Sequence, residues 1–236
     1  MDISFLEKLT NLQSLNLSYN PITDISFLEK LTSLQSLDLS SNKISDYSFL
    51  GKLTNLQSLI LSHNKISDYS FLGKLTNLQS LDLFSNEISD YSFLGKLTSL
   101  QSLNLSYNPI TDISFLEKLT GLRTLWLQGS KISNIEHIQY LQNLIVLHLR
   151  ENQISDISAL KHLKNLKEIE LSSNQIKKLP EWILDFNSDI LYDEGEDDNK
   201  IHIGDNPLES PPIEIAKKGR DAIAKYFNDL KKQGKD

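Results

Sequence analysis

The sequence predicts an α/β repeat solenoid, in which short strands and short helical turns alternate and stack module upon module. Three observations predict it: a repeat of constant length, a strand-like alternation of leucines early in each repeat, and apolar residues at every third position later in it. The 236-residue chain has a formal charge of −7 and no cysteine. Disulfide bonds, cysteine-ligated metals and cysteine nucleophiles are therefore excluded.

The repeat is visible as self-similarity with a step of 22 residues. The segment "LQSLNLSYNPITDISFLEKLT" begins at Leu12 and recurs unchanged at Leu100. Modules open at Leu12, Leu34, Leu56, Leu78, Leu100, Leu122, Leu144 and Leu166. A period of this length is typical of repeats that stack along one axis.

Each module combines two periodicities, here numbered from its first leucine. Apolar positions 4 and 6 alternate with polar positions 3 and 5, which indicates a strand. Apolar positions 14, 17 and 20 recur every three residues, which suits a 3₁₀-like turn. One such module cannot enclose its own apolar side, so neighbouring modules must stack to form a core.

Position 9 holds an asparagine in seven of the eight modules, a column that we call the Asn ladder. Its members are Asn20, Asn42, Asn64, Asn86, Asn108, Asn152 and Asn174. An amide side chain both donates and accepts hydrogen bonds, so we expect each one to satisfy backbone groups in its own module and in the next.

Two further columns have expected structural roles. Position 15 is usually serine and precedes the helical turn, so we expect it to be the N-cap, with Ser26 and Glu29 at capping-box spacing. Position 13 is usually aspartate, as in Asp24. A residue that recurs in every module is architectural, whereas a catalytic residue would occur once.

The pattern L-x-x-L-x-L-x-x-N-x-I with this period resembles leucine-rich repeats of the short class, which includes bacterial internalins and a regulatory subunit of protein phosphatase. The resemblance covers residues 1 to about 180. It implies a right-handed horseshoe with a parallel sheet on the concave side and short helical turns on the convex side. Position 16 departs from the family pattern, because it holds phenylalanine where many relatives have proline. We expect these rings to pack between stacked turns; they are Phe27, Phe49, Phe71, Phe93 and Phe115.

Four segments are expected along the chain. Residues 1–11 form a partial repeat, 12–187 eight repeats, 188–210 an irregular acidic insertion with a degenerate ninth repeat, and 211–236 a C-terminal capping helix. The ninth repeat resumes at Ile201 after about ten extra residues. The start in mid-module suggests either an excised piece of a longer protein or an end that a partner or a second copy covers.

The segment "NPLESPPIEIAKKGRDAIAKYF" is similar to the one that follows the repeats in bacterial Roco-type proteins. That resemblance implies a parent chain that continues into a Ras-like GTPase domain. The present chain itself contains no G-x-x-x-x-G-K-[ST] phosphate loop.

Catalytic and cofactor chemistry is not indicated by the sequence. No histidine pair has metal-ligand spacing, and the acidic run 193–198 lacks the order of a calcium loop. We therefore expect a non-catalytic chain with no metal and no cofactor. The acidic balance argues against nucleic acid, and no apolar run reaches the ~18 residues that a membrane span needs. The N-terminus lacks signal-peptide features and cysteine is missing, so we expect a cytoplasmic location.

The positions that face outward from the predicted sheet vary, and the variation clusters. Phe84 stands at position 7 where most modules have serine, and Tyr107 and Trp126 follow in successive modules. We expect one diagonal aromatic stripe on the concave face, because adjacent strands lie ~4.8 Å apart. The expected partner-binding residues are Ile60, His63, Phe84, Tyr107, Trp126, His148 and Arg150.

Three hypotheses for function remain open at this stage. The first is a protein-binding module that holds a protein or peptide on its concave face. The second is the regulatory repeat domain of a larger GTPase, and the third an engineered solenoid without a natural ligand. Drift among recently duplicated modules is the competing explanation for the aromatic residues.

Overall fold

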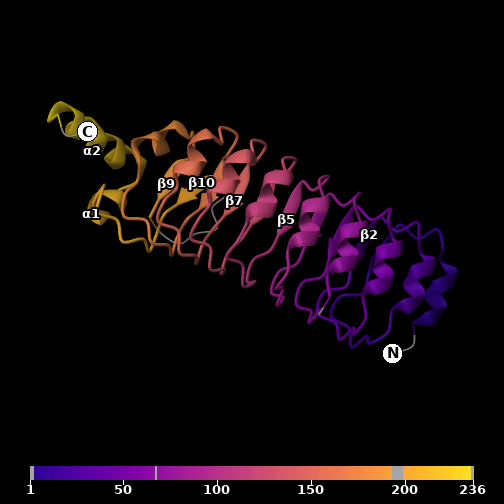
Figure 1. The fold of residues 1–236 in the computed structure, drawn as a ribbon. Coiled ribbons are helices and arrows are strands. Elements are labelled where there is room, and N and C mark those ends of the chain that lie inside the picture. The colour runs from indigo at the N-terminus through magenta and orange to yellow at the C-terminus, as the bar shows by residue number, and fades with distance from the viewer. Residues whose placement is uncertain (1–2, 67, 193–198, 235–236) are drawn as a thin grey trace.

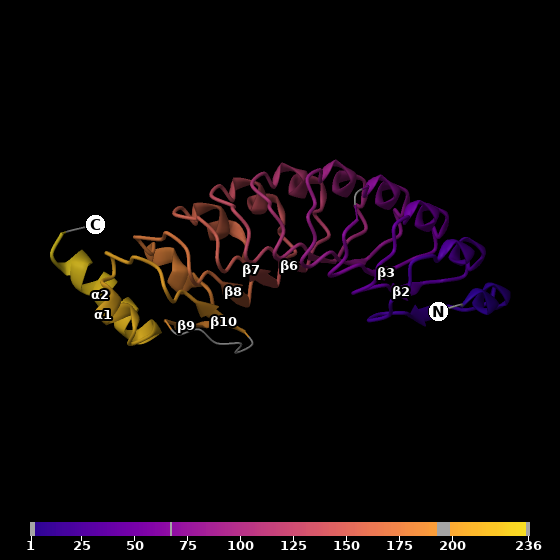
Figure 2. The same cartoon turned by 90° about the horizontal axis from the view of Figure 1, so that it is seen from below.

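The computed structural model describes residues 3–66, 68–192 and 199–234. In this part of the chain, ten short strands form one parallel sheet (Figure 1). Figure 2 shows the resulting arch, with the strands along its inner side and the 3₁₀ helices along its outer side. The α/β solenoid with a concave parallel sheet and convex helical turns is confirmed.

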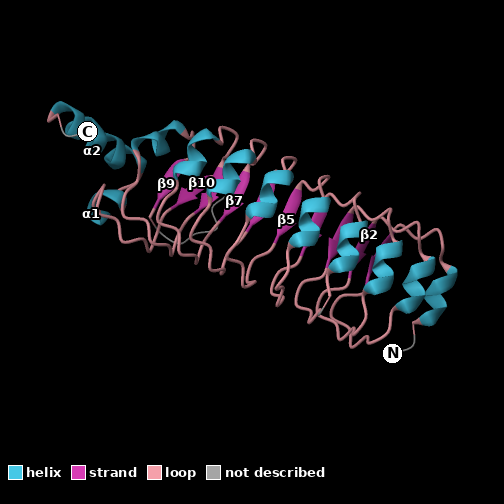
Figure 3. Cartoon of the chain, in the orientation of Figure 1, coloured by secondary structure: helices cyan, strands magenta, loops and turns pink. Residues whose placement is uncertain are grey.

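Each regular module contributes one strand and one 3₁₀ helix, in alternation (Figure 3). The strands are β1 (Ser14–Asn16), β2 (Ser36–Asp38), β3 (Ser58–Ile60), β4 (Ser80–Asp82), β5 (Ser102–Asn104), β6 (Thr124–Trp126), β7 (Val146–His148), β8 (Glu168–Glu170), β9 (Asp189–Leu191) and β10 (Lys200–His202). The 3₁₀ helices are η1 (Ser4–Lys8), η2 (Ser26–Lys30), η3 (Ser48–Lys52), η4 (Ser70–Lys74), η5 (Ser92–Lys96), η6 (Ser114–Lys118), η7 (Glu136–Tyr140), η8 (Ser158–His162) and η9 (Glu181–Asp185).

The register of the sheet follows the sequence repeat directly. Leu15 pairs with Leu37, and Leu37 pairs with Leu59, so equivalent positions lie side by side from β1 to β8. The leucines of positions 1, 4 and 6 are almost completely buried from β2 onward. Their columns form one continuous core, because each module covers the apolar side of the one before it.

The Asn ladder satisfies backbone groups as expected, but toward the preceding module rather than the next. Asn174 donates to the carbonyls of Leu171 in its own module, at 3.0 Å, and Leu149 in the preceding one, at 2.9 Å. Its Oδ1 accepts the N–H of Ile154 at 3.0 Å. The chain leaves each strand in a turn that brings the previous module's carbonyl within reach, so the amide links the two modules backward.

The predicted serine N-caps are wrong. The helix η2 begins at Ser26 itself, its N-cap is Ile25, and no side chain of that residue caps it. Instead, Oδ1 of Asp24 accepts the N–H of Ser26 at 2.9 Å. The helix starts one residue earlier than expected, so the capping oxygen comes from position 13. The backbone N–H of Ser26 also lowers the pKa of Asp24, which supports the architectural role of this column.

The phenylalanines of position 16 pack between stacked convex turns, as predicted. Phe71 stacks on Tyr47 of the preceding module with ring centroids 6.3 Å apart. The pairs Tyr69–Phe93 and Tyr91–Phe115 repeat this arrangement at 6.0 and 5.8 Å. Phe49, Phe71 and Phe93 are buried.

The C-terminal end contains one strand, β9, that the sequence did not predict, beside the expected strand β10 of the ninth module. The strand β10 pairs with β8, with Ile201 beside Ile169, so the repeat register resumes there. The strand β9 pairs with the far side of β10 and forms the outer edge of the sheet. Residues 193–198, the acidic run considered above for calcium, lie outside the described residues.

Two helices, rather than one, end the described chain: α1 (Ile213–Ala216) and α2 (Arg220–Lys232). Gly219 separates them with φ of 80°, a conformation that glycine adopts without strain. Arg220 donates to the carbonyls of Ser188 and Leu184, and Ile223 is fully buried. The helix α2 therefore packs against the end of the solenoid as a cap.

Candidate protein-binding surface

The concave face carries the side chains that alternate with the buried leucines. Within each regular strand, the central residue is buried or nearly so and its two neighbours are more exposed, because successive side chains point to opposite faces of a sheet. Position 5 varies most along this face. From β1 to β8 it holds Asn16, Asp38, Ile60, Asp82, Asn104, Trp126, His148 and Glu170.

A left-handed residue follows each strand and forms the rim of the concave face. Position 8 has φ between 50° and 60° in all nine modules, although only one of these residues is glycine. The residues are Tyr19, Ser41, His63, Ser85, Tyr107, Gly129, Glu151, Ser173 and Asp205. This conformation turns the chain away from the sheet and directs the position-8 side chain outward along the rim. The sequence analysis did not predict it, because nonglycine residues rarely adopt this conformation.

His63, Phe84 and Tyr107 form a contiguous group at this rim, which we call the aromatic cluster. The centroids of Phe84 and His63 lie 5.0 Å apart, and those of Phe84 and Tyr107 lie 5.2 Å apart, both in edge-to-face geometry. Phe84 is half-buried between the other two rings, whereas Tyr107 is 44% exposed. Phe84 thus lies outside the solenoid core, with an exposed ring on each side.

Gly129 supports the aromatic cluster from the next module. An added Cβ at this position would lie 2.5 Å from the ring of Tyr107, so no other residue fits beneath the ring as it stands. The backbone there also has φ of 60°, which glycine adopts without strain. The sequence shows that position 8 of this module is glycine, but it does not show that this residue leaves room for the ring of Tyr107.

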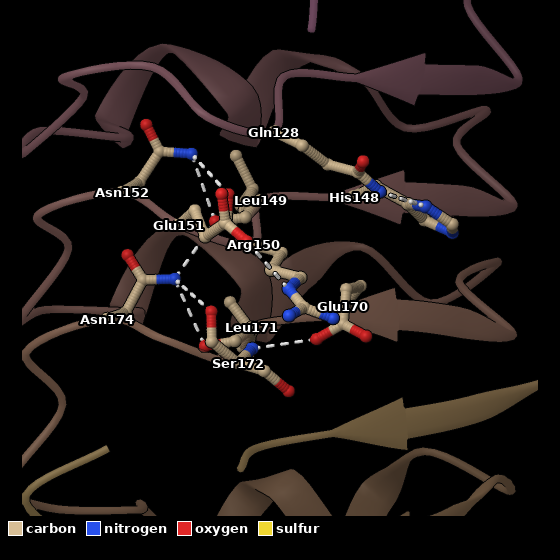
Figure 4. Close-up of polar contacts among 10 residues, drawn as sticks. All are labelled: Gln128, His148, Leu149, Arg150, Glu151, Asn152, Glu170, Leu171, Ser172 and Asn174. Atoms are coloured by element: carbon tan, nitrogen blue, oxygen red, sulfur yellow. Dashed lines mark hydrogen bonds and ion pairs between the residues drawn. The ribbon is translucent and has the colours of Figure 1, made fainter. Parts of the chain in front are cut away.

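Trp126 belongs to a second group, together with His148. Their ring centroids lie 6.3 Å apart, edge to face. The imidazole of His148 is held at both nitrogens. Nδ1 lies 2.9 Å from Nε2 of Gln128 (Figure 4), and Nε2 lies 2.6 Å from Oε1 of Glu168. Because the amide nitrogen can only donate, Nδ1 accepts and Nε2 donates to the carboxylate. These contacts fix the orientation of the ring.

The remaining predicted residues lie beside these two groups. Ile60 is partly exposed on β3, between Asp38 and Asp82 of the neighbouring strands. Arg150 lies after β7, with Nε 3.1 Å from a carboxylate oxygen of Glu151 (Figure 4). On the concave face of the described chain the ring contacts thus form two groups, and no ring contact there joins Tyr107 to Trp126. The single diagonal stripe expected from strand spacing is divided.

Asp82 is the ionisable residue of the concave face whose pKa is shifted most clearly by its surroundings. Burial raises the pKa of Asp82, while hydrogen bonds from Phe84 and Asn104 oppose the shift. Oδ1 accepts the N–H of Phe84 at 2.8 Å, and Oδ2 accepts Nδ2 of Asn104 at 3.3 Å. The carboxylate therefore lies in a partly desolvated position beside the aromatic cluster.

Other kinds of site receive no support from the described residues. Within ranges 3–66, 68–192 and 199–234, no three histidine, aspartate or glutamate side chains come together in a group suited to a metal ion. Helices in the same ranges are all too short or too polar to cross a membrane.

Comparison with known proteins identifies the class to which the chain belongs. A family model described as "Leucine Rich repeats (2 copies)" matches residues 2–53, 54–96, 98–140 and 142–184. These matches cover most of the sequence, so the chain belongs to the leucine-rich-repeat family. No curated protein matches it.

Solved structures of bacterial repeat proteins share the fold. An internalin (inlF) from Listeria monocytogenes is 36% identical with a TM-score of 0.77, over 88% of this chain and 58% of that chain. An internalin C2 from the same species is 40% identical with a TM-score of 0.67, over 70% of this chain and 73% of that one. A leucine-rich-repeat protein of Leptospira interrogans is 27% identical with a TM-score of 0.71, over 87% and 61%. The chain therefore spans about three fifths of two of these relatives.

Proposed function

We propose that the chain is a non-catalytic module that binds a protein or peptide on its concave face. The observation that carries the proposal is the aromatic cluster, because Phe84 contacts both His63 and Tyr107 on a face that in these modules is mostly lined by serine, glutamine, asparagine and aspartate. Aromatic residues dominate binding hot spots, since they bury a large area at a small entropic cost. The ring of His148, held in place beside Trp126, adds a second aromatic surface on the same face.

A double substitution tests this proposal. Phe84→Ala combined with Trp126→Ala should weaken partner binding by roughly 2 kcal/mol or more. Both side chains are only partly buried, and five other modules have serine at the position of Phe84, so the solenoid should still fold. Partners captured from cell extract by the wild type would be compared with those captured by the double variant, followed by titration calorimetry on each.

The matched control is Tyr140→Ala, which removes an aromatic ring that is 49% exposed on the convex helix η7. This variant should retain the affinity of the wild type. Equal affinity of the double variant and the control would contradict binding at the concave face.

A second surface favours association with another copy of this chain. At the N-terminal end of the described solenoid, Phe5 is 64% exposed and Leu9 is 47% exposed, beside the edge strand β1. Exposed apolar groups next to an unpaired strand edge are favourable for association. Phe5→Lys with Leu9→Lys should abolish any concentration-dependent dimer in analytical ultracentrifugation, and a wild type that stays monomeric at all concentrations would contradict this role.

We further propose that these repeats are one domain of a larger protein, and the similarity to the Roco-type junction motivates a GTPase as the neighbour. The reading frame of the parent gene tests this: a phosphate-loop motif downstream would support it. The engineered-scaffold hypothesis predicts instead that no natural gene carries these modules. Cytoplasmic location likewise stays a prediction.

A further inference from the structure

The concave face of the first five modules carries two carboxylates and neither lysine nor arginine; its one titratable base is His63, whose charge lowers the pKa of Asp82 against the effect of burial. Among positions 2, 3, 5, 7 and 8 of these modules, the only carboxylates are Asp38 and Asp82, and no lysine or arginine occurs. The lysines of the same modules lie elsewhere: Lys30 and Lys52, for example, form ion pairs with Glu7 and Glu29 between convex helices. Neither Asp38 nor Asp82 has an ion-pair partner within the described chain.

The two carboxylates form a symmetric row across five adjacent strands. In register from β1 to β5, position 5 holds Asn16, Asp38, Ile60, Asp82 and Asn104. Each aspartate accepts a hydrogen bond from the asparagine on its outer side, at 3.2 Å from Asn16 and 3.3 Å from Asn104. The other oxygen of each accepts a backbone N–H of its own module.

The centre of this row is apolar and carries no hydrogen-bond donor toward either carboxylate. Ile60 separates the two aspartates, which lie two strand spacings apart, or ~10 Å between their Cα atoms. A carboxylate has about four acceptor positions. Asp38 accepts three hydrogen bonds, because the Ser40 hydroxyl also donates to Oδ1 at 2.7 Å, and Asp82 accepts two, so each keeps unused acceptor capacity. The negative charge of Asp38 also contributes to the raised pKa of Asp82, so the two groups repel each other across Ile60.

A partner that covers the aromatic cluster must also cover this row. Phe84 follows Asp82 by two residues, and the backbone N–H of Phe84 is bound to its carboxylate. Removing a carboxylate from water without a counter-charge costs several kcal/mol. A cation from the partner offsets that cost, and long cationic side chains can lay their apolar stems on a residue such as Ile60.

Building on the proposed function, we propose that the partner is a basic peptide segment that places an arginine or lysine over Ile60, with its charge between Asp38 and Asp82. An apolar residue of the same segment then packs against the aromatic cluster. Arginine suits the site better, because its planar guanidinium carries five N–H donors and can contact two carboxylates at once.

Selection from a random peptide library tests this proposal. Peptides would be selected on the wild-type chain and depleted on the Phe84→Ala/Trp126→Ala variant, so that only concave-face binders remain. Arginine and lysine should be enriched in these binders relative to the library. For one synthesised binder, Asp38→Asn with Asp82→Asn should weaken binding roughly tenfold or more, since hydrogen bonds to charged groups are the stronger ones.

The asparagine substitutions remove charge and keep the backbone bond to Oδ1 in each module, whereas the bonds from Asn16 and Asn104 to the outer carboxylate oxygens are lost. Asn16 and Asn104 occupy the same position in other modules and accept the same backbone bond, from Ser18 at 2.9 Å and Ser106 at 3.0 Å. The control Glu87→Gln removes one negative charge from an exposed residue outside the strands and should leave binding unchanged.

The outcomes separate the two proposals. Concave-face binders without cationic enrichment, or binders insensitive to the double asparagine variant, would overturn the basic partner and leave the protein-binding function standing. A library that yields no peptide dependent on Phe84 and Trp126 would overturn both.

Discussion

Two stretches of the Asn ladder have the same sequence pattern but different hydrogen bonds. In the C-terminal stretch, Oδ1 of each asparagine accepts the N–H of an isoleucine in the preceding module at 3.0 Å. These pairs are Asn152–Ile132, Asn174–Ile154 and Asn206–Ile176. In the central stretch, the buried Oδ1 atoms of Asn86 and Asn108 have no hydrogen-bond partner among the described residues.

The difference follows from position 14 of the preceding module. In the C-terminal stretch this position holds isoleucine or leucine, whereas in the central stretch it holds Tyr47, Tyr69 and Tyr91. The hydroxyl of Tyr47 donates to Oδ1 of Asn64 at 2.8 Å, that of Tyr91 donates to a backbone carbonyl, and that of Tyr69 is buried without a partner. The tyrosine at position 14 thus changes the hydrogen bonding of the asparagine at position 9. The same residue at position 9 therefore does not make the same bonds in every module.

The largest expected effect on stability distinguishes the C-terminal stretch of the ladder from the central one. Asn174→Ala removes bonds to three buried carbonyls and to the N–H of Ile154, and should lower the free energy of unfolding by about 4 kcal/mol. Asn86→Ala removes the equivalent carbonyl bonds but no bond to Oδ1, so its cost should be about 1–2 kcal/mol smaller. Urea denaturation of both variants measures the difference, and equal losses would mean that the ladder oxygen contributes nothing.

A gain of stability is expected where the ladder is interrupted. Ser130 occupies position 9 of the sixth module, and its buried hydroxyl has no partner within the described chain. Ser130→Asn should restore bonds to the carbonyls of this module and the preceding one, and should raise the free energy of unfolding by about 1–2 kcal/mol. Thermal denaturation against the wild type measures the shift. Destabilisation would show that this module has no room for the amide.

The stacked architecture could be predicted because it depends on columns that repeat. Leu37 and its equivalents give the strand, and Phe71 and its equivalents are spaced to stack on the preceding turn. The left-handed rim could not be predicted, since Tyr107 or His63 does not signal a positive φ as glycine does. The strand β9 lies between the eighth module and the resumed register, so no repeating column marks it.

The candidate site was predictable in membership but not in arrangement. Variation in the outward columns identified Phe84 and Trp126, whose exposure follows from strand alternation alone. Their grouping depends on side-chain contacts: Tyr107 lies over Gly129 toward Phe84, while Trp126 contacts His148. Such contacts depend on side-chain conformations that column positions do not specify.

A matched pair of hydroxyl deletions sharpens the comparison within the central stretch. Tyr47→Phe removes the bond to Asn64 and should destabilise the chain by about 1 kcal/mol. Tyr69→Phe removes a buried hydroxyl that has no partner among the described residues, and should stabilise it by up to about 1 kcal/mol. Both variants keep the ring that stacks on the next module. Effects of the same sign in urea denaturation would contradict the difference between the two modules.

The smallest effect is a dependence on alkaline pH that comes from the same tyrosine. Burial raises the pKa of Tyr69 well above its usual value near 10, so the folded state retains the phenol proton after the unfolded state has lost it. The contribution of this proton to the free energy of unfolding is fully present well below pH 10, where both states keep the proton. It is lost as pH rises toward the folded pKa, since the unfolded state binds fewer protons in that range. At pH 10 this loss is about 0.4 kcal/mol for one such group. Urea denaturation from pH 8 to pH 10 should therefore show a shallower decline for Tyr69→Phe than for the wild type, and parallel declines would mean that Tyr69 ionises as readily in the folded chain as in the unfolded one.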